Sequence, residues 1–242
     1  MKKTYWKDFW EEQTTGLHRS QEEAFLKTES KEKLFHLGSG EKLLDFGCGS
    51  ADLFVYYTSA YHFCVGIDRS KLLLEKAAER IKSFQNQDNT FLINSDHAQM
   101  WHDIEQQFGQ DFKFDCITTG QVIQYLEKKQ IDDFIRHATA HLTDTGKICL
   151  FDIVDSRTHE LWKAGLYRQN SLNMSVMMKL LYGRLKGIFN KLRGKPSYEL
   201  GYAYPPAFFA DLAKKYNLQV SCANSMYYEY RYHIFFEKLK TV

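Results

Sequence analysis

Three acidic residues stand at the ends of short apolar runs in the first hundred residues of the chain. Asp45 follows Leu43 and Leu44, Asp68 closes the run VGID, and Asp96 closes the run INSD. An unpaired buried carboxylate is costly, so Asp45 needs a positively charged partner, and a nearby ammonium or sulfonium group would keep it ionised. Asp68 lies 23 residues after Asp45, about where an acid binds ribose hydroxyls in a nucleotide-binding sheet. With Asp96 accepting from an exocyclic amine, the three acids predict a cradle for a positively charged nucleoside.

A glycine-rich turn follows the first of these acids. Gly47 and Gly49 allow a ligand to lie directly against the backbone. A dinucleotide site requires a third glycine at the position that Asp52 occupies. Asp45 and Asp52 would also repel a diphosphate in a cleft of low dielectric constant. The turn therefore favours a cationic ligand, and a nicotinamide-dependent oxidoreductase remains as the less favoured enzymatic alternative.

The elements that must position these residues alternate regularly between strand and helix. Apolar strand-like runs are each followed by a segment with helical periodicity, which is typical of βαβ units in a parallel, doubly wound sheet. The predicted strands cover residues 42–47, 62–68, 90–96, 114–120 and 147–155. The predicted helices between them cover residues 50–60, 70–84, 98–108 and 128–142. A last helix over 205–217 and a closing hairpin over 218–239 complete the pattern.

The stretches LLDFGCGSAD, VGIDRS, NSDHAQM and FDCITTGQVIQYL together resemble the class I S-adenosylmethionine-dependent methyltransferases. Asp45, Gly47 and Gly49 meet that family's acid-x-Gly-x-Gly pattern, while Ala51 replaces its frequent third glycine. The resemblance covers about 41–155 and, more loosely, 205–239. It implies an α/β fold with a doubly wound, Rossmann-like sheet of seven strands in the order 3-2-1-4-5-7-6. Strand 7 is then antiparallel, and helices cover both faces.

The resemblance also implies a cofactor, S-adenosylmethionine, with S-adenosylhomocysteine as the product. Within the family, Asp45 and the glycines would hold the methionine end, Asp68 the ribose, and Asp96 with the His97 backbone the adenine. The residues that the resemblance places around the cofactor are Asp45, Phe46, Gly47, Cys48, Gly49, Asp68, Arg69, Asp96, His97, Thr119, Gly120 and Gln121. The last three, after the fourth strand, would line the methionine and the reaction side.

Methyl transfer from a sulfonium is an in-line displacement in which the cofactor supplies the activated carbon and the protein supplies alignment. A general base is required only if the acceptor is protonated at neutral pH. Tyr125 stands where related small-molecule enzymes often carry a residue facing the acceptor, so we predict it as the catalytic candidate; the alternative is an amphipathic residue on a helix. Asp152 and Asp155, after the fifth strand, are candidates to orient the acceptor. We expect transfer to an oxygen or nitrogen of a small molecule, and a non-catalytic module that binds S-adenosylmethionine is the alternative.

Two segments lie outside the resemblance and divide the chain. Residues 1–40 are predicted to form an N-terminal helical arm over the site, in which His18 and Arg19 are candidate substrate contacts; the alternative is that both are solvated. The predicted core comprises 41–155 and 205–242. Residues 156–204 would form a lid around the acceptor.

This lid is basic, because eight lysines and arginines and no acids lie between Glu160 and Glu199. Three interpretations fit it: an apolar-faced lid helix with a solvated basic face, a lid that recognises an anionic acceptor (phosphorylated or carrier-bound, for example), or an interfacial helix over 179–195 on anionic lipid.

The composition limits the other classes of function. The 242 residues carry a net charge of only +2, which argues against a dedicated nucleic-acid binder. Five cysteines without a Cys-x-x-Cys pair, and an N-terminus without an apolar leader, predict a cytoplasmic protein. Asp133, His137 and His141 share one helical face, but without a metal-binding motif we predict no metal site. A monomer and a homodimer both remain open.

Overall fold

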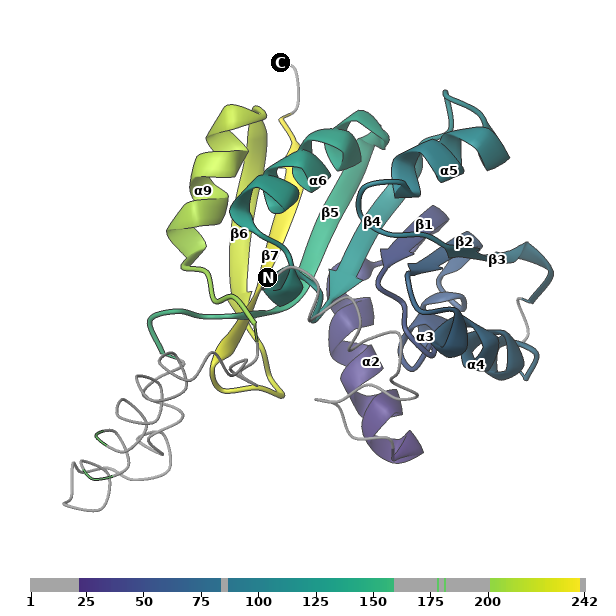
Figure 1. Ribbon diagram of the computed structural model, residues 1–242, viewed down its shortest axis with the longest axis horizontal. Coiled ribbons are helices and arrows are strands. Elements are labelled where there is room, and N and C mark those ends of the chain that lie inside the picture. Colours follow the sequence, from purple (N-terminus) through teal and green to yellow (C-terminus); the bar gives the residue numbers. More distant parts are fainter. Residues whose placement is uncertain (1–21, 84–86, 159–177, 179–180, 182–200, 240–242) are drawn as a thin grey trace, which may run out of the picture.

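Seven strands form one mixed sheet at the centre of the protein (Figure 1). Their order is β3-β2-β1-β4-β5-β7-β6, and β7 runs antiparallel to both of its neighbours, β5 and β6, while all the other pairs are parallel. This confirms the predicted order and direction. The strands are β1 Gly40–Phe46, β2 Tyr61–Asp68, β3 Thr90–Asn94, β4 Phe114–Gly120, β5 Leu142–Val154, β6 Leu218–Asn224 and β7 Arg231–Lys238. The residues that this computed structural model describes are 22–83, 87–158, 178, 181 and 201–239.

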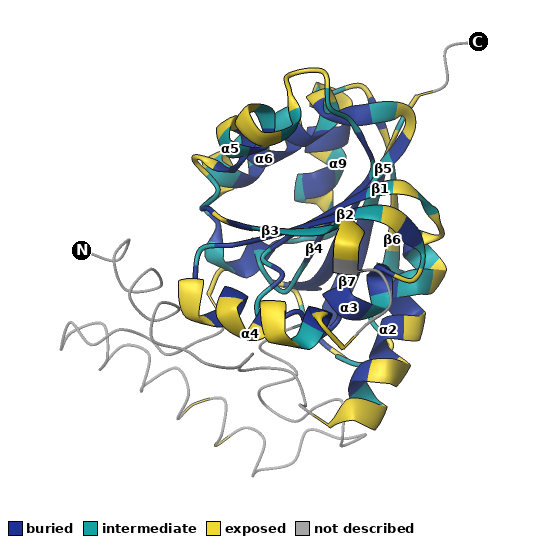
Figure 2. Cartoon of the chain, turned by 90° about the vertical axis from the view of Figure 1, so that its right-hand side faces the viewer, coloured by how far each residue is buried: buried dark blue, intermediate teal, exposed yellow. Residues whose placement is uncertain are grey.

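Helices cover both faces of the sheet (Figure 2), as a doubly wound fold requires. One face carries α5, α6 and α9, and the other carries α2, α3 and α4. Their bounds are α2 Glu23–Leu37, α3 Phe54–Tyr57, α4 Lys71–Ile81, α5 Met100–Phe108, α6 Lys128–Ala140 and α9 Pro206–Lys215. The alternation of side chains along β1 divides the core between these faces. Leu44 packs in the cluster beneath α5, α6 and α9, while Leu43 packs in the cluster beneath α2, α3 and α4.

Local sequence signals explain where several helices begin. Ser70 caps α4 by accepting a hydrogen bond from the backbone N–H of Leu73 (3.3 Å). Glu127 and Gln130 form a reciprocal capping box at the start of α6. The helix expected over 50–60 is confined to the single turn of α3, because Ala51 takes a left-handed conformation (φ 61°) that ends the preceding turn.

The carboxyl ends of the central strands meet at one edge of the sheet, which places the predicted site there. Asp45 of β1 lies beside Gly66 of β2 and Thr118 of β4 in the register of the sheet. Asp68, the last residue of β2, lies beside Asn94 of β3. Residues from separate parts of the sequence therefore lie side by side along the carboxyl edge of the sheet.

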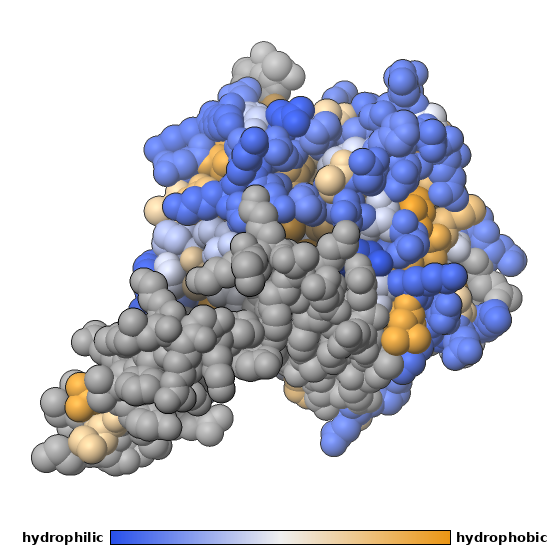
Figure 3. Space-filling model, in the orientation of Figure 1, coloured by the Kyte–Doolittle hydropathy of each residue, from blue (hydrophilic) through white to orange (hydrophobic). Residues whose placement is uncertain are grey.

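The outer surface carries few large apolar side chains in the part of the chain that the structure describes. The face in Figure 3 is mainly hydrophilic where it is coloured, with small separate apolar areas. The exposed large apolar residues among those described are Phe35, Leu72, Met178, Leu181, Tyr202, Met226 and Leu239. No helix within the described ranges combines the length and the apolar character needed to cross a membrane.

Candidate functional site

The turn after β1 brings bare backbone to the carboxyl edge of the sheet. Gly47 and Gly49 both take positive φ values, 80° and 57°, which glycine adopts without strain. A Cβ at Gly47 would lie 2.2 Å from Cγ2 of Val122, so packing also requires a glycine there. A Cβ at Gly49 would meet no atom within 4 Å. Gly49 therefore borders open space at the position where a ligand would approach the backbone.

Asp68 ties this turn to the end of β2. Its Oδ2 accepts a hydrogen bond from the backbone N–H of Gly49 (2.9 Å), and its Oδ1 accepts one from the N–H of Ser70 (2.8 Å). Burial raises the pKa of Asp68 above its ordinary value despite these hydrogen bonds. The carboxylate thus lies directly against the glycine turn, where it can accept further hydrogen bonds from a pair of hydroxyls.

Asp45 contributes a second buried acid to the same edge. Its residue is only 6% exposed. Both acids also act on the thiol of Cys48. Burial raises the pKa of this thiol, and the negative charges of Asp68 and Asp45 raise it further. Two carboxylates therefore act on one small region around the turn, which suits a cation.

Asp96 and His97 follow β3 and lie at the same edge. The Oδ1 atom of Asp96 accepts hydrogen bonds from the backbone N–H groups of Ala98 (2.9 Å) and Gln99 (3.3 Å). Asp96 therefore shapes the turn that leads into α5, a structural role that does not involve its Oδ2. The His97 ring contacts the side-chain amide of Gln130 at 2.6 Å, which links this turn to α6.

The end of β4 presents two buried polar atoms that make no hydrogen bond within the described residues. These are Oγ1 of Thr119 and Nε2 of Gln121. Thr119 is fully buried, and Gln121 takes a left-handed conformation (φ 59°) immediately after Gly120. Since most buried polar atoms in folded proteins have hydrogen-bond partners, such a pair at a strand end fits a polar ligand. β4 adjoins β1, so both atoms belong to the same edge as Asp45.

Tyr125 follows the end of β4 in the chain and lies in the 3₁₀ turn Ile123–Tyr125 rather than in a regular helix. Its Oη accepts a hydrogen bond from Nε2 of Gln124 (2.9 Å). Burial raises the pKa of Tyr125 to about 12, although Gln124 and the charge of Arg231 act in the opposite direction. The phenol is therefore protonated at neutral pH and is better suited to donate a hydrogen bond than to remove a proton.

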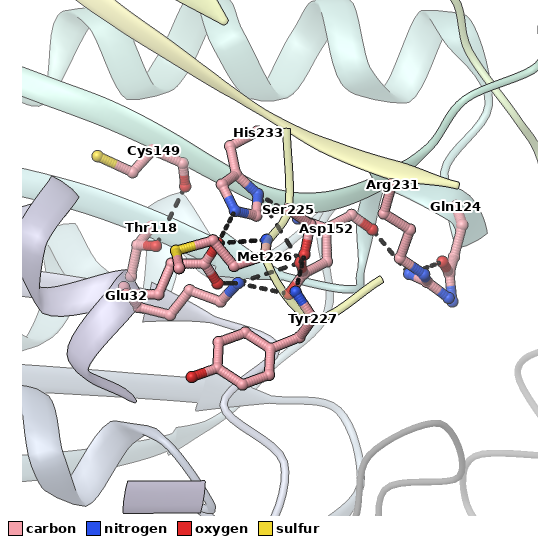
Figure 4. A network of polar contacts seen from close by, with 11 residues as sticks. Glu32, Thr118, Gln124, Cys149, Asp152, Ser225, Met226, Tyr227, Arg231 and His233 are labelled. Carbon is pink, nitrogen blue, oxygen red and sulfur yellow. Dashed lines mark hydrogen bonds and ion pairs between the residues drawn. The ribbon is translucent and has the colours of Figure 1, made fainter. Parts of the chain in front are cut away.

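The carboxylate of Asp152 is engaged inside the protein (Figure 4). Its Oδ1 accepts hydrogen bonds from Nζ of Lys33 (3.1 Å) and from Oγ of Ser225 (2.9 Å), and Lys33 is also 3.0 Å from its Oδ2. Both Asp152 and Lys33 are fully buried. Asp155 is paired with Arg157 (2.7 Å). Each acid therefore has a cationic partner within the chain, so its carboxylate is engaged there rather than offered to an acceptor.

Several residues of this buried network carry no sequence signal of their own. Glu32 accepts hydrogen bonds from Lys33 (2.8 Å) and from the N–H of Met226 (2.7 Å), and its Oε1 lies 3.2 Å from Nε2 of His233. Nδ1 of His233 accepts from the N–H of Asp152 (3.1 Å), so Nε2 carries the ring proton. Burial by itself raises the pKa of Glu32, but the hydrogen bonds from His233 and Lys33 outweigh it and hold the pKa at about 2.

Some of the other residues predicted for the site lie within the described part of the chain, and others lie outside it. Phe46, Cys48 and Arg69 lie in or beside the turns already described. His18 and Arg19 lie outside the described residues, as does nearly all of 156–204. The described ranges contain no group of three or more histidine, cysteine, aspartate or glutamate side chains that could hold a metal ion.

Solved structures with the same fold include several methyltransferases. Magnesium protoporphyrin IX methyltransferase from Synechocystis, with bound S-adenosylmethionine, is 12% identical, with a TM-score of 0.60 over 99% of this chain and 98% of that one. Phosphoethanolamine N-methyltransferase 1 from Haemonchus contortus, in complex with phosphoethanolamine and S-adenosylhomocysteine, is 13% identical (TM-score 0.67; 99% of this chain, 49% of that one). The N-methyltransferase NodS from Bradyrhizobium japonicum, in complex with S-adenosylhomocysteine, is 13% identical (TM-score 0.59; 98% and 99%). At these identities the likeness is one of fold.

A family model provides the sequence-based comparison. The family described as "Methyltransferase domain" matches residues 44–148, a range that begins in β1 and ends in β5 and includes the glycine turn. A search of curated proteins found no significant match. Residues 44–148 therefore match a methyltransferase domain family, and the chain has the fold of the methyltransferases named above.

Proposed function

We propose that the protein transfers a methyl group from S-adenosylmethionine to an oxygen or nitrogen atom of a small acceptor. The observation that carries this proposal is the composition of one sheet edge within the methyltransferase domain. Two buried acids adjoin an open glycine turn: Asp45 precedes it on β1, and Asp68 accepts a hydrogen bond from the N–H of Gly49. Thr119 and Gln121 add two buried polar atoms without partners in the described residues. This set suits a ligand that is cationic at one end and rich in hydroxyl groups elsewhere.

The chain's own residues would hold such a donor by contacts of distinct kinds. Asp68 would accept hydrogen bonds from the ribose hydroxyls, and Asp45 would neutralise the positive charge of the methionine end. The turn before α5, with Asp96 and the His97 backbone, would address the adenine. Thr119 and Gln121 would contact the methionine end. The bound donor supplies the activated methyl group, so the protein's task is alignment and exclusion of water.

The acceptor side would lie beyond β4, around Tyr125. Its neutral phenol would donate a hydrogen bond to the acceptor and fix its orientation. The related structures named above act on a porphyrin and on phosphoethanolamine, and both support a small-molecule acceptor here. The arm 1–40 and the basic lid 156–204 remain our prediction for the remaining walls.

The test is to identify the donor directly. Mass spectrometry of small molecules retained by the purified protein, followed by calorimetry with S-adenosylhomocysteine and with a nicotinamide dinucleotide, separates the candidates. We expect S-adenosylhomocysteine to bind and the dinucleotide not to bind. The opposite result favours an oxidoreductase. Binding of S-adenosylmethionine without turnover across an acceptor panel favours the non-catalytic alternative.

A further inference from the structure

Arg231 is a buried cation at the carboxyl edge of the sheet. It is the first residue of β7, opposite Val154 of β5, and it is 2% exposed. Its Nη1 donates to Oε1 of Gln124 (2.8 Å) and to the backbone oxygen of Asp152 (2.7 Å), as Figure 4 shows. Both hydrogens of Nη1 are therefore used, and the guanidinium is held in one orientation.

The other two nitrogens of this guanidinium have no hydrogen-bond partner in the described part of the chain. Nε and Nη2 of Arg231 are both buried and both lack a partner there. Nε–H and one N–H of Nη2 lie on the same edge of a guanidinium, and this edge binds the two oxygens of a carboxylate or phosphate side by side. The unused donors thus form a complete two-pronged site.

No carboxylate within the described residues forms an ion pair with Arg231, in contrast to other cations of this chain. Lys33 is paired with Glu32 and Asp152, and Arg157 is paired with Asp155. The carboxylate of Asp152 faces Lys33, so only its backbone oxygen reaches Arg231. A buried charge without a counter-ion is unfavourable.

Aromatic rings supply only part of the missing compensation. The guanidinium carbon lies 5.5 Å from the ring centroid of Tyr228 and 5.2 Å from that of Tyr230. Such cation–π contacts are weaker than pairing with an anion. Neither ring supplies an acceptor for the hydrogens of Nε and Nη2, which stay available to a ligand.

The position of Arg231 relates it to the acceptor rather than to the donor. Gln124 joins it to Tyr125, because Oε1 of Gln124 accepts from Arg231 while Nε2 donates to the phenol. The proposed donor site lies at the ends of β1, β2 and β4, and in the strand order β5 stands between β4 and β7. An anion bound to Arg231 would therefore lie at the same part of the sheet edge as the turn that carries Gln124 and Tyr125, on the acceptor side.

We propose that the Nε–Nη2 edge of Arg231 binds a two-oxygen anionic group, a carboxylate or a phosphate, of the methyl acceptor. That the bound anion belongs to a methyl acceptor rests on the proposed function, whereas the anion site itself follows from the geometry of Arg231. The acceptor is thus an anionic small molecule, oriented by Arg231 at one end and by Tyr125 nearer the reacting atom.

The experiment measures anion binding by the full-length protein without any acceptor. The thermal unfolding midpoint and calorimetric affinity are recorded with inorganic phosphate, acetate or chloride at matched ionic strength, with and without S-adenosylhomocysteine. Wild type should be stabilised more by phosphate or by acetate than by chloride, because a ligand of the folded state raises its stability. Which of the two anions acts distinguishes a phosphate from a carboxylate acceptor. The absence of any preference over chloride contradicts the proposal.

Three variants locate the binding. Arg231→Met should weaken the preferred anion at least tenfold, and Arg231→Lys should weaken it less, since lysine keeps the charge but lacks the fork. Arg157→Met is the matched control, a cation already paired with Asp155, and should bind as wild type does. The assignment is overturned if either Arg231→Lys or Arg231→Met binds the anion as tightly as wild type does. It is also overturned if Arg157→Met loses as much anion affinity as the Arg231 variants do. If Arg231→Met does not fold by circular dichroism, Arg231→Lys decides.

S-Adenosylhomocysteine separates this proposal from the proposed function. If it binds to wild type and to the Arg231 variants alike while no anion preference exists, the donor assignment stands and the anion site fails. If an Arg231-dependent anion preference exists but S-adenosylhomocysteine does not bind, the anion site stands and the proposed methyl donor fails.

Discussion

Lys33 and Asp152, 119 residues apart in the sequence, form a fully buried ion pair whose shortest contact is 3.0 Å. The lysine comes from α2 and the aspartate from the carboxyl end of β5. Asp152 itself takes a left-handed conformation (φ 57°), at the point where the pairing of β5 with β7 is interrupted. Glu32, Ser225 and His233 complete the surroundings of the pair. The pair therefore joins α2 to the end of β5, where the backbone oxygen of Asp152 also accepts a hydrogen bond from Arg231 of β7.

Replacing Lys33 by methionine should strongly destabilise the protein. The change leaves Glu32 and Asp152 buried with no lysine between them, and loss of one partner of a buried pair costs about 3–5 kcal/mol. Urea unfolding followed by circular dichroism gives the difference in the free energy of unfolding. Lys31→Met, on the exposed side of the same helix, is the control and should change it by less than about 0.5 kcal/mol. A loss below about 1 kcal/mol for Lys33→Met would show that the pair adds little to stability.

Acid should weaken the fold partly through Glu32. Its pKa is about 2 in the folded chain against 4.5 as the ordinary value. A lowered folded-state pKa stabilises the protein above the unfolded value, and this stability is lost as the pH falls from 4.5 toward 2. Between pH 7 and pH 3 the loss from this one group is about 2 kcal/mol.

The measurement is the free energy of unfolding as a function of pH for wild type and Glu32→Gln. The variant should lose less stability than wild type over this range, because glutamine does not titrate. Parallel pH profiles for the two proteins would contradict the low pKa of Glu32.

Asp68→Ala should weaken binding of S-adenosylhomocysteine at least tenfold, which corresponds to about 1.4 kcal/mol. The substitution removes the proposed acceptor for the ribose hydroxyls and also releases the N–H of Gly49. Calorimetry measures the affinity, and Asp88→Ala, an exposed acid, is the control. Asp68→Asn keeps an oxygen for hydrogen bonding and should give an intermediate affinity. Affinity equal to wild type in a folded Asp68→Ala variant would refute the ribose assignment.

Tyr125 should remain protonated throughout the neutral and mildly alkaline range. Burial raises its pKa to about 12, so the phenolate becomes populated only in strong alkali. The difference in ultraviolet phenolate absorbance between wild type and Tyr125→Phe isolates this one residue from the other tyrosines. A difference that titrates near the ordinary value of 10 would show that the phenol is solvated and able to act as a base at lower pH.

Once an acceptor is known, Tyr125→Phe should lower kcat/KM about tenfold or more while the affinity for S-adenosylhomocysteine stays unchanged, because the lost hydrogen bond belongs to the acceptor side. A loss confined to donor binding would move Tyr125 to the other side of the site.

Much of the fold was predictable because it rests on local periodicity. The alternation of apolar runs and helical segments predicted the strands around Asp45 and Asp68 and the helices α4, α5 and α6, and the pattern from Pro205 onward predicted α9 and the closing hairpin. It did not include α2, which lies within 1–40 and packs on one face of the sheet. The apolar runs before Asp45 and Asp68 indicated that both stand at strand ends, and parallel pairing then placed them at one edge. The predicted length of the helix over 50–60 was wrong, because helical periodicity does not reveal the left-handed conformation of Ala51.

The sequence by itself determined the fold class, the acid-glycine turn and the kind of ligand that this turn suits. Only the tertiary structure decided the pairing of charges: that Asp152 faces Lys33 and that Arg231 reaches Gln124, 107 residues away, with two nitrogens left unused. The physical reason is that secondary structure depends on neighbours a few residues apart. The partner of a buried charge, in contrast, depends on which distant side chains packing brings within about 3 Å, and no local pattern records that distance.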